Sequence, residues 1–152
     1  MIRPGQAKGP SLQGAGGTPV NPPHSPTWFK FSVTHLDFQI GALTNDIELY
    51  SMPAESVLHG AILKPSTTFL GGAIASYKLS LGLTGDLQRY MNLADVFTGP
   101  VAGDYFYDSS FMEARSFTVA TSIRIAAQSI GANLSASTQG AADIWLLISD
   151  LP

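Results

Sequence analysis

Apolar and polar side chains alternate along much of the chain from residue 28 onward, and this period of two constrains the fold more than any other feature. Successive side chains of a β-strand point to opposite faces of the sheet, so the pattern predicts strands with one buried face. The stretch IASYKLSLGL is the clearest case, with one face formed by Ala75, Tyr77, Leu79, Leu81 and Leu83.

Several further stretches repeat this alternation. Phe29, Phe31 and Val33 share one phase, and the apolar phase then slips by one residue, so we expect a bulge or turn near His35. In DIELYSM, Ile47 lies on the face opposite Tyr50. SVLHGAILKP reads as a strand that ends at Pro65, and FTVATSIRIAAQ reads as a later strand.

Two stretches depart from simple alternation. DIWLLIS is apolar on both faces, which is typical of a central strand or of a strand buried in a subunit contact. DLQRYMNLADVFTGP places apolar residues at helical spacing and is compatible with a short helix. The remaining pattern, seven to nine short strands separated by turn signals, predicts an all-β antiparallel β-sandwich, and we expect a jelly roll.

The first 26 residues contrast with the rest of the chain. They hold eleven Gly and Pro residues, no Asp or Glu, and few branched apolar side chains. This composition cannot bury enough apolar surface to offset the entropy of ordering. We therefore expect an extended arm over residues 1–26 and one β-sandwich domain over residues 27–152. A polyproline-like arm of this length reaches on the order of 80 Å, enough to cross a neighbouring subunit.

Charge and composition exclude several classes of function. Asp, Glu, Lys and Arg make up only 12% of the chain, and all eleven acids lie beyond the arm, so no basic stripe for nucleic acid is expected. The chain lacks cysteine, which excludes disulfides and thiolate metal sites. The N-terminus has no apolar core of a signal peptide, and no stretch is long enough to span a membrane. We expect neither nucleic acid nor membrane as a partner.

The titratable residues form no recognisable catalytic or metal-binding motif. His35 and Asp37 are read as a structural polar pair, and His59 as a hydrogen-bonded histidine of an apolar strand. Asp46 and Glu48 share one face of a strand, where a calcium site is the alternative to a solvated polar face. No nucleophile elbow or phosphate loop is present, so we expect no enzyme activity, no cofactor and no metal.

Aromatic and acidic residues gather in GDYFYDSSF. Carboxylates beside aromatic rings are also found in sugar-binding sites, so this stretch is a candidate glycan or surface contact. Its candidate residues are Asp104, Tyr105, Tyr107 and Asp108. A surface loop or a subunit contact remains the alternative.

From Thr44 to Ser149 the chain resembles small structural proteins of tailed-phage virions. The resemblance rests on TNDIELYSMPAESVLHGAILKPSTTFLGGAIASYKLSLGLTGD, on DVF, and on ATSIRIAAQSIGANLSASTQGAADIWLLIS. It implies an auxiliary head protein of the decoration or cement type, with a jelly-roll body, which binds the major capsid protein on the outer surface of the capsid and forms a homotrimer.

The resemblance does not extend to the arm, whose role is inferred from its composition. A proline-rich strap loses less entropy on ordering, because the φ angles of its prolines are already fixed. We expect arm contacts with partners through Arg3, Lys8, Leu12, Val20 and Trp28. The alternatives are a flexible tether for the arm, and for the whole chain a carbohydrate-binding or host-recognition module of a phage tail or fibre, or a hydrolase whose triad is assembled across the fold.

Overall fold

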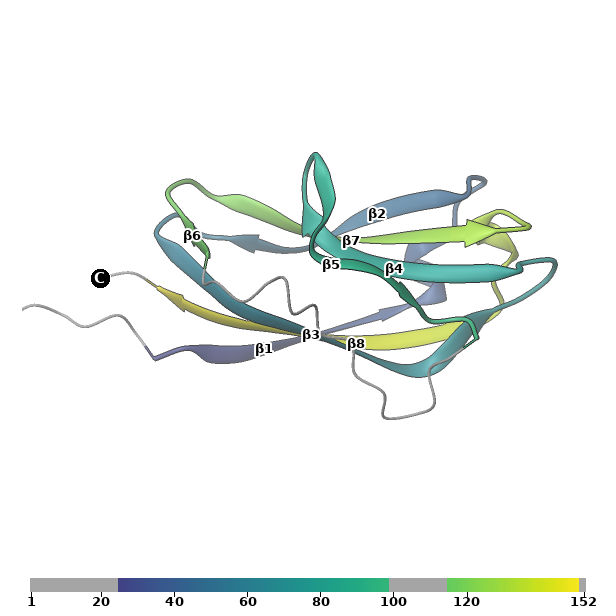
Figure 1. Ribbon diagram of the computed structural model, residues 1–152, viewed down its shortest axis with the longest axis horizontal. Coiled ribbons are helices and arrows are strands. Elements are labelled where there is room, and N and C mark those ends of the chain that lie inside the picture. Colours follow the sequence, from purple (N-terminus) through teal and green to yellow (C-terminus); the bar gives the residue numbers. More distant parts are fainter. Residues whose placement is uncertain (1–24, 99–114, 151–152) are drawn as a thin grey trace, which may run out of the picture.

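Eight strands form two antiparallel sheets that pack face to face in the computed structural model, which describes residues 25–98 and 115–150 (Figure 1). Sheet A has the order β1-β8-β3-β6 and sheet B the order β2-β7-β4-β5. The strands are β1 (Thr27–Thr34), β2 (Thr44–Met52), β3 (Ser56–Leu70), β4 (Ser76–Leu83), β5 (Asp86–Asp95), β6 (Arg115–Phe117), β7 (Thr121–Ile130) and β8 (Gln139–Asp150).

The strand pairing is that of a jelly roll. β1 pairs with β8, β2 with β7, β3 with β6 and β4 with β5, so the chain forms one long nested hairpin. The nested hairpin folds over on itself, and the two sheets are completed where β8 meets β3 and β7 meets β4. This arrangement confirms the predicted antiparallel sandwich and its jelly-roll topology.

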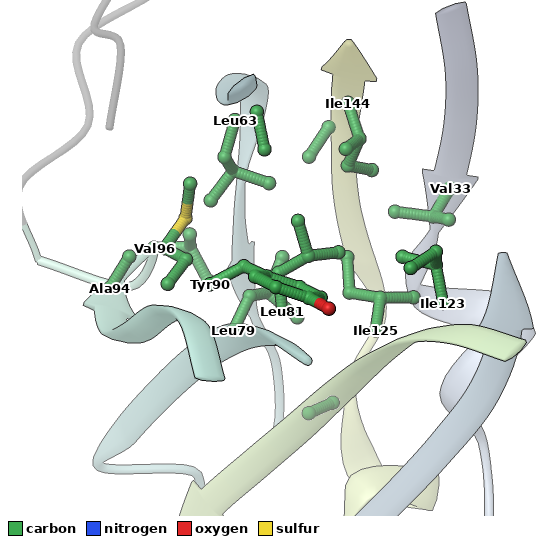
Figure 2. Close-up of a cluster of buried hydrophobic side chains, with 14 of the residues drawn as sticks. Val33, Leu63, Leu79, Leu81, Tyr90, Ala94, Val96, Ile123, Ile125 and Ile144 are labelled. Atoms are coloured by element: carbon green, nitrogen blue, oxygen red, sulfur yellow. The ribbon is translucent and has the colours of Figure 1, made fainter. Parts of the chain in front are cut away.

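The core fills the space between the sheets. Sheet A contributes the inward side chains of β3 and β8, and sheet B those of β4 and β7, as the alternation predicts. Figure 2 shows this contact, in which Leu63 and Ile144 face Leu79, Leu81 and Ile125. β8 is central in sheet A, which confirms the first of the two interpretations of DIWLLIS.

The phase slip after β1 corresponds to a turn, as predicted. Residues His35–Phe38 form a short 3-10 helix, η2, and Phe38 is fully buried at its end. Asp37 Oδ2 accepts hydrogen bonds from Thr34 N at 2.7 Å and from Thr34 Oγ1 at 3.1 Å. His35 and Asp37 therefore do not lie on a strand, as the sequence suggested, although Asp37 has a structural role because it caps the start of η2. A second 3-10 helix, η3 (Leu134–Ala136), lies between β7 and β8.

Two strands depart from their predicted pattern. β2 has a register shift between Glu48 and Tyr50, so Tyr50 pairs with Ile123 and its ring contacts Phe31 of β1. Its predicted placement opposite Ile47 was therefore wrong. β3 continues past Pro65, where its register against β8 shifts. A proline is tolerated there because, among the described residues, β6 pairs with only the first three residues of β3 and Pro65 lies beyond that pairing.

The helix considered for residues 86–100 is not formed, because residues 86–95 are strand β5. Register shifts in the β4–β5 pairing turn both Tyr90 and Met91 into the core. The predicted strand over FTVATSIRIAAQ is also interrupted, since a turn separates β6 from β7 and exposes Val119. In the two described stretches, no helix has the length and apolar content needed to cross a membrane.

Candidate functional site

The outer face of sheet A carries a platform of exposed and half-buried apolar side chains. Trp28 of β1 pairs with Leu147 of β8, and Leu147 in turn pairs with Gly60 of β3. The next outward row joins Lys30, Trp145 and Ile62 in the same order of strands. We define the tryptophan platform as Trp28, Ile62, Trp145 and Leu147.

Alternation along β8 and a glycine on β3 produce this platform. β8 buries Ile144 and Leu146 in the core and therefore turns Trp145 and Leu147 to the outer face. A Cβ at Gly60 would lie 4.0 Å from Cη2 of Trp28, so the indole ring reaches across β8 to β3. Trp28 nevertheless keeps 47% of its surface exposed. Both tryptophans of the chain thus lie on one outer face.

A charged border adjoins the platform. Lys30 Nζ lies 3.0 Å from Asp143 Oδ2 and 5.3 Å from the centroid of the Trp145 ring. Ser32 Oγ donates to Asp143 Oδ1 at 2.6 Å. Burial by itself raises the pKa of Asp143, but the hydrogen bonds from Ser32 and Lys30, and the positive charges of Lys30 and Lys64, lower it below its ordinary value. Asp143 is therefore held ionised at the Trp145 end of the platform.

A groove opens at the seam between the sheets, where β1 begins. Along the inward face of β1 exposure rises from 3% at Val33 to 40% at Phe29, so the sandwich is open at this end. The Tyr50 ring lies 6.1 Å from the Phe29 ring and 5.5 Å from the Phe31 ring, measured between centroids. We call this the seam groove; its volume is about 300 Å³ and its lining is Ser25, Thr27, Phe29, Tyr50, Pro53, Ile148, Ser149 and Asp150.

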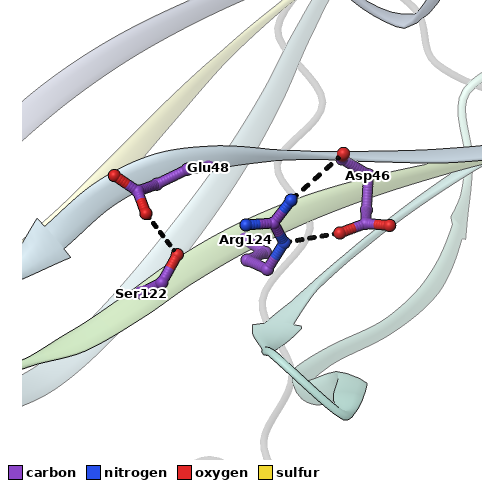
Figure 3. Close-up of polar contacts among 4 residues, drawn as sticks. All are labelled: Asp46, Glu48, Ser122 and Arg124. Carbon is purple, nitrogen blue, oxygen red and sulfur yellow. Dashed lines mark hydrogen bonds and ion pairs between the residues drawn. The ribbon is translucent and has the colours of Figure 1, made fainter.

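The outer face of sheet B is polar and internally paired. Arg124 Nε donates to Asp46 Oδ2 at 2.5 Å, and Ser122 Oγ donates to Glu48 Oε2 at 2.7 Å (Figure 3). Each carboxylate thus already has a protein partner on β7. This pairing favours the reading as a polar face over the calcium alternative, and no group of three or more potential metal ligands occurs within residues 25–98 and 115–150.

A cleft of about 220 Å³ lies beside these pairs on sheet B. Its floor includes Ser80 and Ala126, which pair across β4 and β7, and its walls include Leu87 of β5. The side chains that line the cleft are amides, hydroxyls and aliphatic groups, together with the carboxylate of Asp46. That carboxylate is already bound to Arg124. The cleft therefore offers no nucleophile and base in contact.

The two histidines in the described part of the chain, His35 and His59, lie in secondary structure and form no metal-binding group. His59 Nε2 lies 2.7 Å from Ser149 Oγ, between the neighbouring strands β3 and β8, which confirms the predicted hydrogen-bonded histidine. His35 begins η2. Within the described residues no carboxylate contacts either His59 or Ser149, so no Ser-His-Asp constellation is assembled at this point of the fold.

The structure places only one of the predicted contact residues. Trp28 begins the tryptophan platform, whereas Arg3, Lys8, Leu12 and Val20 lie outside the described residues, as do Asp104, Tyr105, Tyr107 and Asp108. Sequence reasoning missed Trp145, Leu147 and Tyr50 as surface candidates. Trp145 and Leu147 could have been found, because DIWLLIS is apolar on the face that alternates with its core residues. The bulge that turns Tyr50 toward Phe29 has no corresponding pattern in the sequence.

Comparison with known proteins finds the same fold in phage capsids. A chain of the cyanophage Pam1 capsid asymmetric unit superposes with a TM-score of 0.58 at 16% identity, covering 92% of this chain and 95% of that chain. A chain of the capsid of Ralstonia phage GP4 superposes with a TM-score of 0.55 at 20% identity, covering 93% and 94%. Identities this low establish a shared fold. No protein-family model matches the sequence, and neither does any curated protein.

Proposed function

We propose that this chain is a non-enzymatic component of a phage capsid, which binds the assembled head and stabilises it as a decoration or cement protein. The observation that carries the proposal is the shared jelly roll, which spans more than nine tenths of this chain and of the capsid chains that it resembles. Because both chains are covered almost completely, they are also of similar length.

The tryptophan platform supports a role in assembly. Trp is among the residues that contribute most to binding free energy at protein interfaces, and clustered exposed aromatic residues mark contact surfaces. Trp28 and Trp145 lie on neighbouring strands with Lys30 and Asp143 at their border, an apolar centre with a charged rim. We assign this face to the contact with the major capsid protein on the outer surface of the head.

Stabilisation then follows from thermodynamic linkage. A protein that binds the assembled lattice and not its free subunits stabilises the lattice by its binding free energy. A homotrimer would bring three platforms to the head at once, so that individually weak contacts give tight binding. The trimer is part of the proposal and is tested by the molar mass of the purified chain in solution.

The arm supplies the second contact in this account. Residues 1–26 carry Arg3 and Lys8 and no acid, whereas the rest of the chain carries all eleven acids, so the arm and the neighbouring bodies have opposite charge. Six prolines lower the entropy that the arm loses on binding. We propose that the arm is a strap, with Leu12 and Val20 as its apolar contacts.

Sedimentation with purified heads tests the proposed function. The full chain is mixed with heads that lack it and, separately, with unassembled major capsid protein. We expect the chain to sediment with assembled heads and to show no binding to free capsid subunits. Equal binding to both would remove the linkage argument, and absence of binding to heads would reject the proposed function.

A further inference from the structure

The seam groove has features of a binding site for an extended, proline-rich segment. Phe29 and Tyr50 stack with an interplanar angle of 17°, and Pro53 and Ile148 extend the apolar lining. Phe29 faces the space between the sheets yet keeps 40% of its surface exposed. Aromatic rings that line a shallow groove are the usual receptors for polyproline-like chains, which fit such grooves at low entropic cost.

The open backbone of the flanking strands adds a second feature. Among the strands that the structure describes, β1 pairs only with β8 and β2 only with β7, so the groove lies between two sheet edges. In β1, eight residues without proline or glycine present an unpaired edge at which Trp28 and Phe29 are exposed. Natural proteins cover or interrupt such edges, because these edges otherwise pair with other chains. A segment lying in the seam groove would cover this one.

We propose that the seam groove binds residues 18–24 of a second copy of this chain. This inference rests on the proposed function, because it names the surface that the strap contacts. The segment TPVNPPH carries three prolines, one valine and no acid. Its prolines match the Phe29 and Tyr50 rings, and it brings no carboxylate that would repel Asp150 at the rim.

The position of Ser25 favours an arm from a second copy, rather than the chain's own arm, as the segment that occupies the seam groove. Ser25 itself lines the groove, so the described chain begins at the rim of the groove. To enter its own groove, the segment before Ser25 would have to reverse direction at once. The sequence disfavours such a reversal. A residue that precedes proline is restricted to extended conformations, and Asn21, Pro22 and Ser25 each directly precede a proline.

Exchange of arms between copies also fits the geometry of a closed oligomer. Each copy offers one groove and one arm that starts beside it, so a rotation axis near this end would let every arm fill a neighbour's groove. Once one contact between two copies has formed, the next becomes intramolecular and benefits from a high effective concentration. The same contact would thereby join the strap to the oligomer.

Disulfide trapping tests the inference, and the absence of native cysteine makes every cross-link interpretable. One full-length copy carries Asn21→Cys, and the other carries Asp150→Cys at the exposed rim of the groove. The matched control replaces Asp150→Cys by Ser135→Cys, which is exposed in η3 at the far end of the sandwich. We expect the mixed N21C–D150C dimer to exceed the N21C–S135C dimer by about ten-fold or more after mild oxidation.

A double variant with N21C and D150C in one chain distinguishes the occupants. An internal link in a monomer, with no mixed dimer from the single variants, would mean that the arm fills its own groove and would overturn the inference. Equal linking to D150C and S135C, or no linking at all, would also overturn it. Tyr50→Ala in the D150C copy, confirmed as folded by its cooperative unfolding, should reduce the mixed dimer to the level of the S135C control.

Head binding measured on the same variants separates the two proposals. A chain that sediments with heads but gives no N21C–D150C dimer rejects the arm exchange and leaves the proposed function in place. A chain that gives the N21C–D150C dimer but does not bind heads supports the arm exchange and rejects the proposed function.

Discussion

At the scale of single residues, Tyr77 is a large buried side chain whose hydroxyl has no hydrogen-bond partner in the described part of the chain. Its ring is fully buried and packs against Phe69 at 4.9 Å between centroids, and within the described residues its hydroxyl makes no hydrogen bond. Burial raises the pKa of Tyr77, because it disfavours the charged form, so the buried group is the neutral hydroxyl. The hydroxyl therefore costs desolvation without a compensating bond.

We predict that Tyr77→Phe leaves the free energy of unfolding unchanged or raises it by about 1 kcal/mol, because it removes an unsatisfied polar atom and keeps the ring. Urea unfolding measures the change. Tyr77→Ala is the matched control and should lower the free energy of unfolding by about 3–5 kcal/mol through the cavity that it creates. A loss of more than about 1 kcal/mol in the Phe variant would show that the hydroxyl has a partner.

Asp143 gives the molecule a predictable response to acid. Its pKa is lowered in the folded state, so the folded chain binds a proton less readily than the unfolded chain does. The resulting stability is present above the ordinary Asp pKa of 3.8 and is lost as the pH falls through the lower folded-state pKa. Lys30 is half exposed, which limits the contribution of the ion pair.

We therefore predict that Asp143→Asn lowers the free energy of unfolding at pH 7 by roughly 1 kcal/mol or less. The difference from the unsubstituted chain should shrink as the pH is lowered below 3.8. Denaturant unfolding over a pH series measures it. A difference that stays constant down to the acid limit would mean that the Asp143 charge contributes nothing.

At the scale of elements, β5 passes unusually close to β4. A Cβ built on Gly82 would lie 2.1 Å from the Asp86 carbonyl oxygen and 2.7 Å from Leu87 Cα. Both obstacles are backbone atoms, so no side-chain rotation relieves the clash. The hairpin that joins β4 and β5 stands out from sheet B in Figure 1, and Gly82 is what allows the strand to return so close to the sheet.

We predict that Gly82→Ala lowers the free energy of unfolding by about 2 kcal/mol or more, because the β4–β5 hairpin must move. Gly41→Ala is the control, since a Cβ there meets no atom within 4 Å; it should be neutral or slightly stabilising. Thermal unfolding of the two variants measures the contrast. Equal melting temperatures would contradict the close approach.

The same bulges explain which elements could be predicted from the sequence. Where pairing is regular, as between β4 and β7, alternation identified the strand and the buried side chains Tyr77, Leu79 and Leu81; Ala75, predicted on the same face, precedes β4 and is exposed. In β5 the register shifts bury Tyr90, Met91 and Ala94, a spacing that resembles one face of a helix. A single-sequence pattern cannot distinguish a bulged strand from a short helix, because the bulge is set by the partner strand.

At the scale of the whole molecule, surfaces are assembled from strands that are distant in the sequence. The tryptophan platform joins β1, β8 and β3, and the seam groove joins the start of β1 to β2 and the end of β8. The sandwich and its jelly-roll topology could be predicted. The groove could not, because it depends on where two sheet edges meet.

The platform yields a prediction about binding at this scale. Trp28 keeps 47% of its surface exposed, so Trp28→Ala should change the free energy of unfolding little but weaken head binding about 30-fold, the effect of losing about 2 kcal/mol at an interface hot spot. Leu36→Ala is the control, because Leu36 is 65% exposed in η2, away from the platform. Equal losses of affinity in both variants would exclude the platform as the contact.

Calorimetric melting of heads that lack this chain, with and without added full-length chain, tests the central claim most directly. Binding that is restricted to the assembled lattice must raise the melting temperature of the heads, and the rise must grow with the concentration of free chain. Our account predicts that increase, and predicts a smaller one for Trp28→Ala. A melting temperature that does not change at saturating concentrations of the chain would contradict a stabilising role on the head.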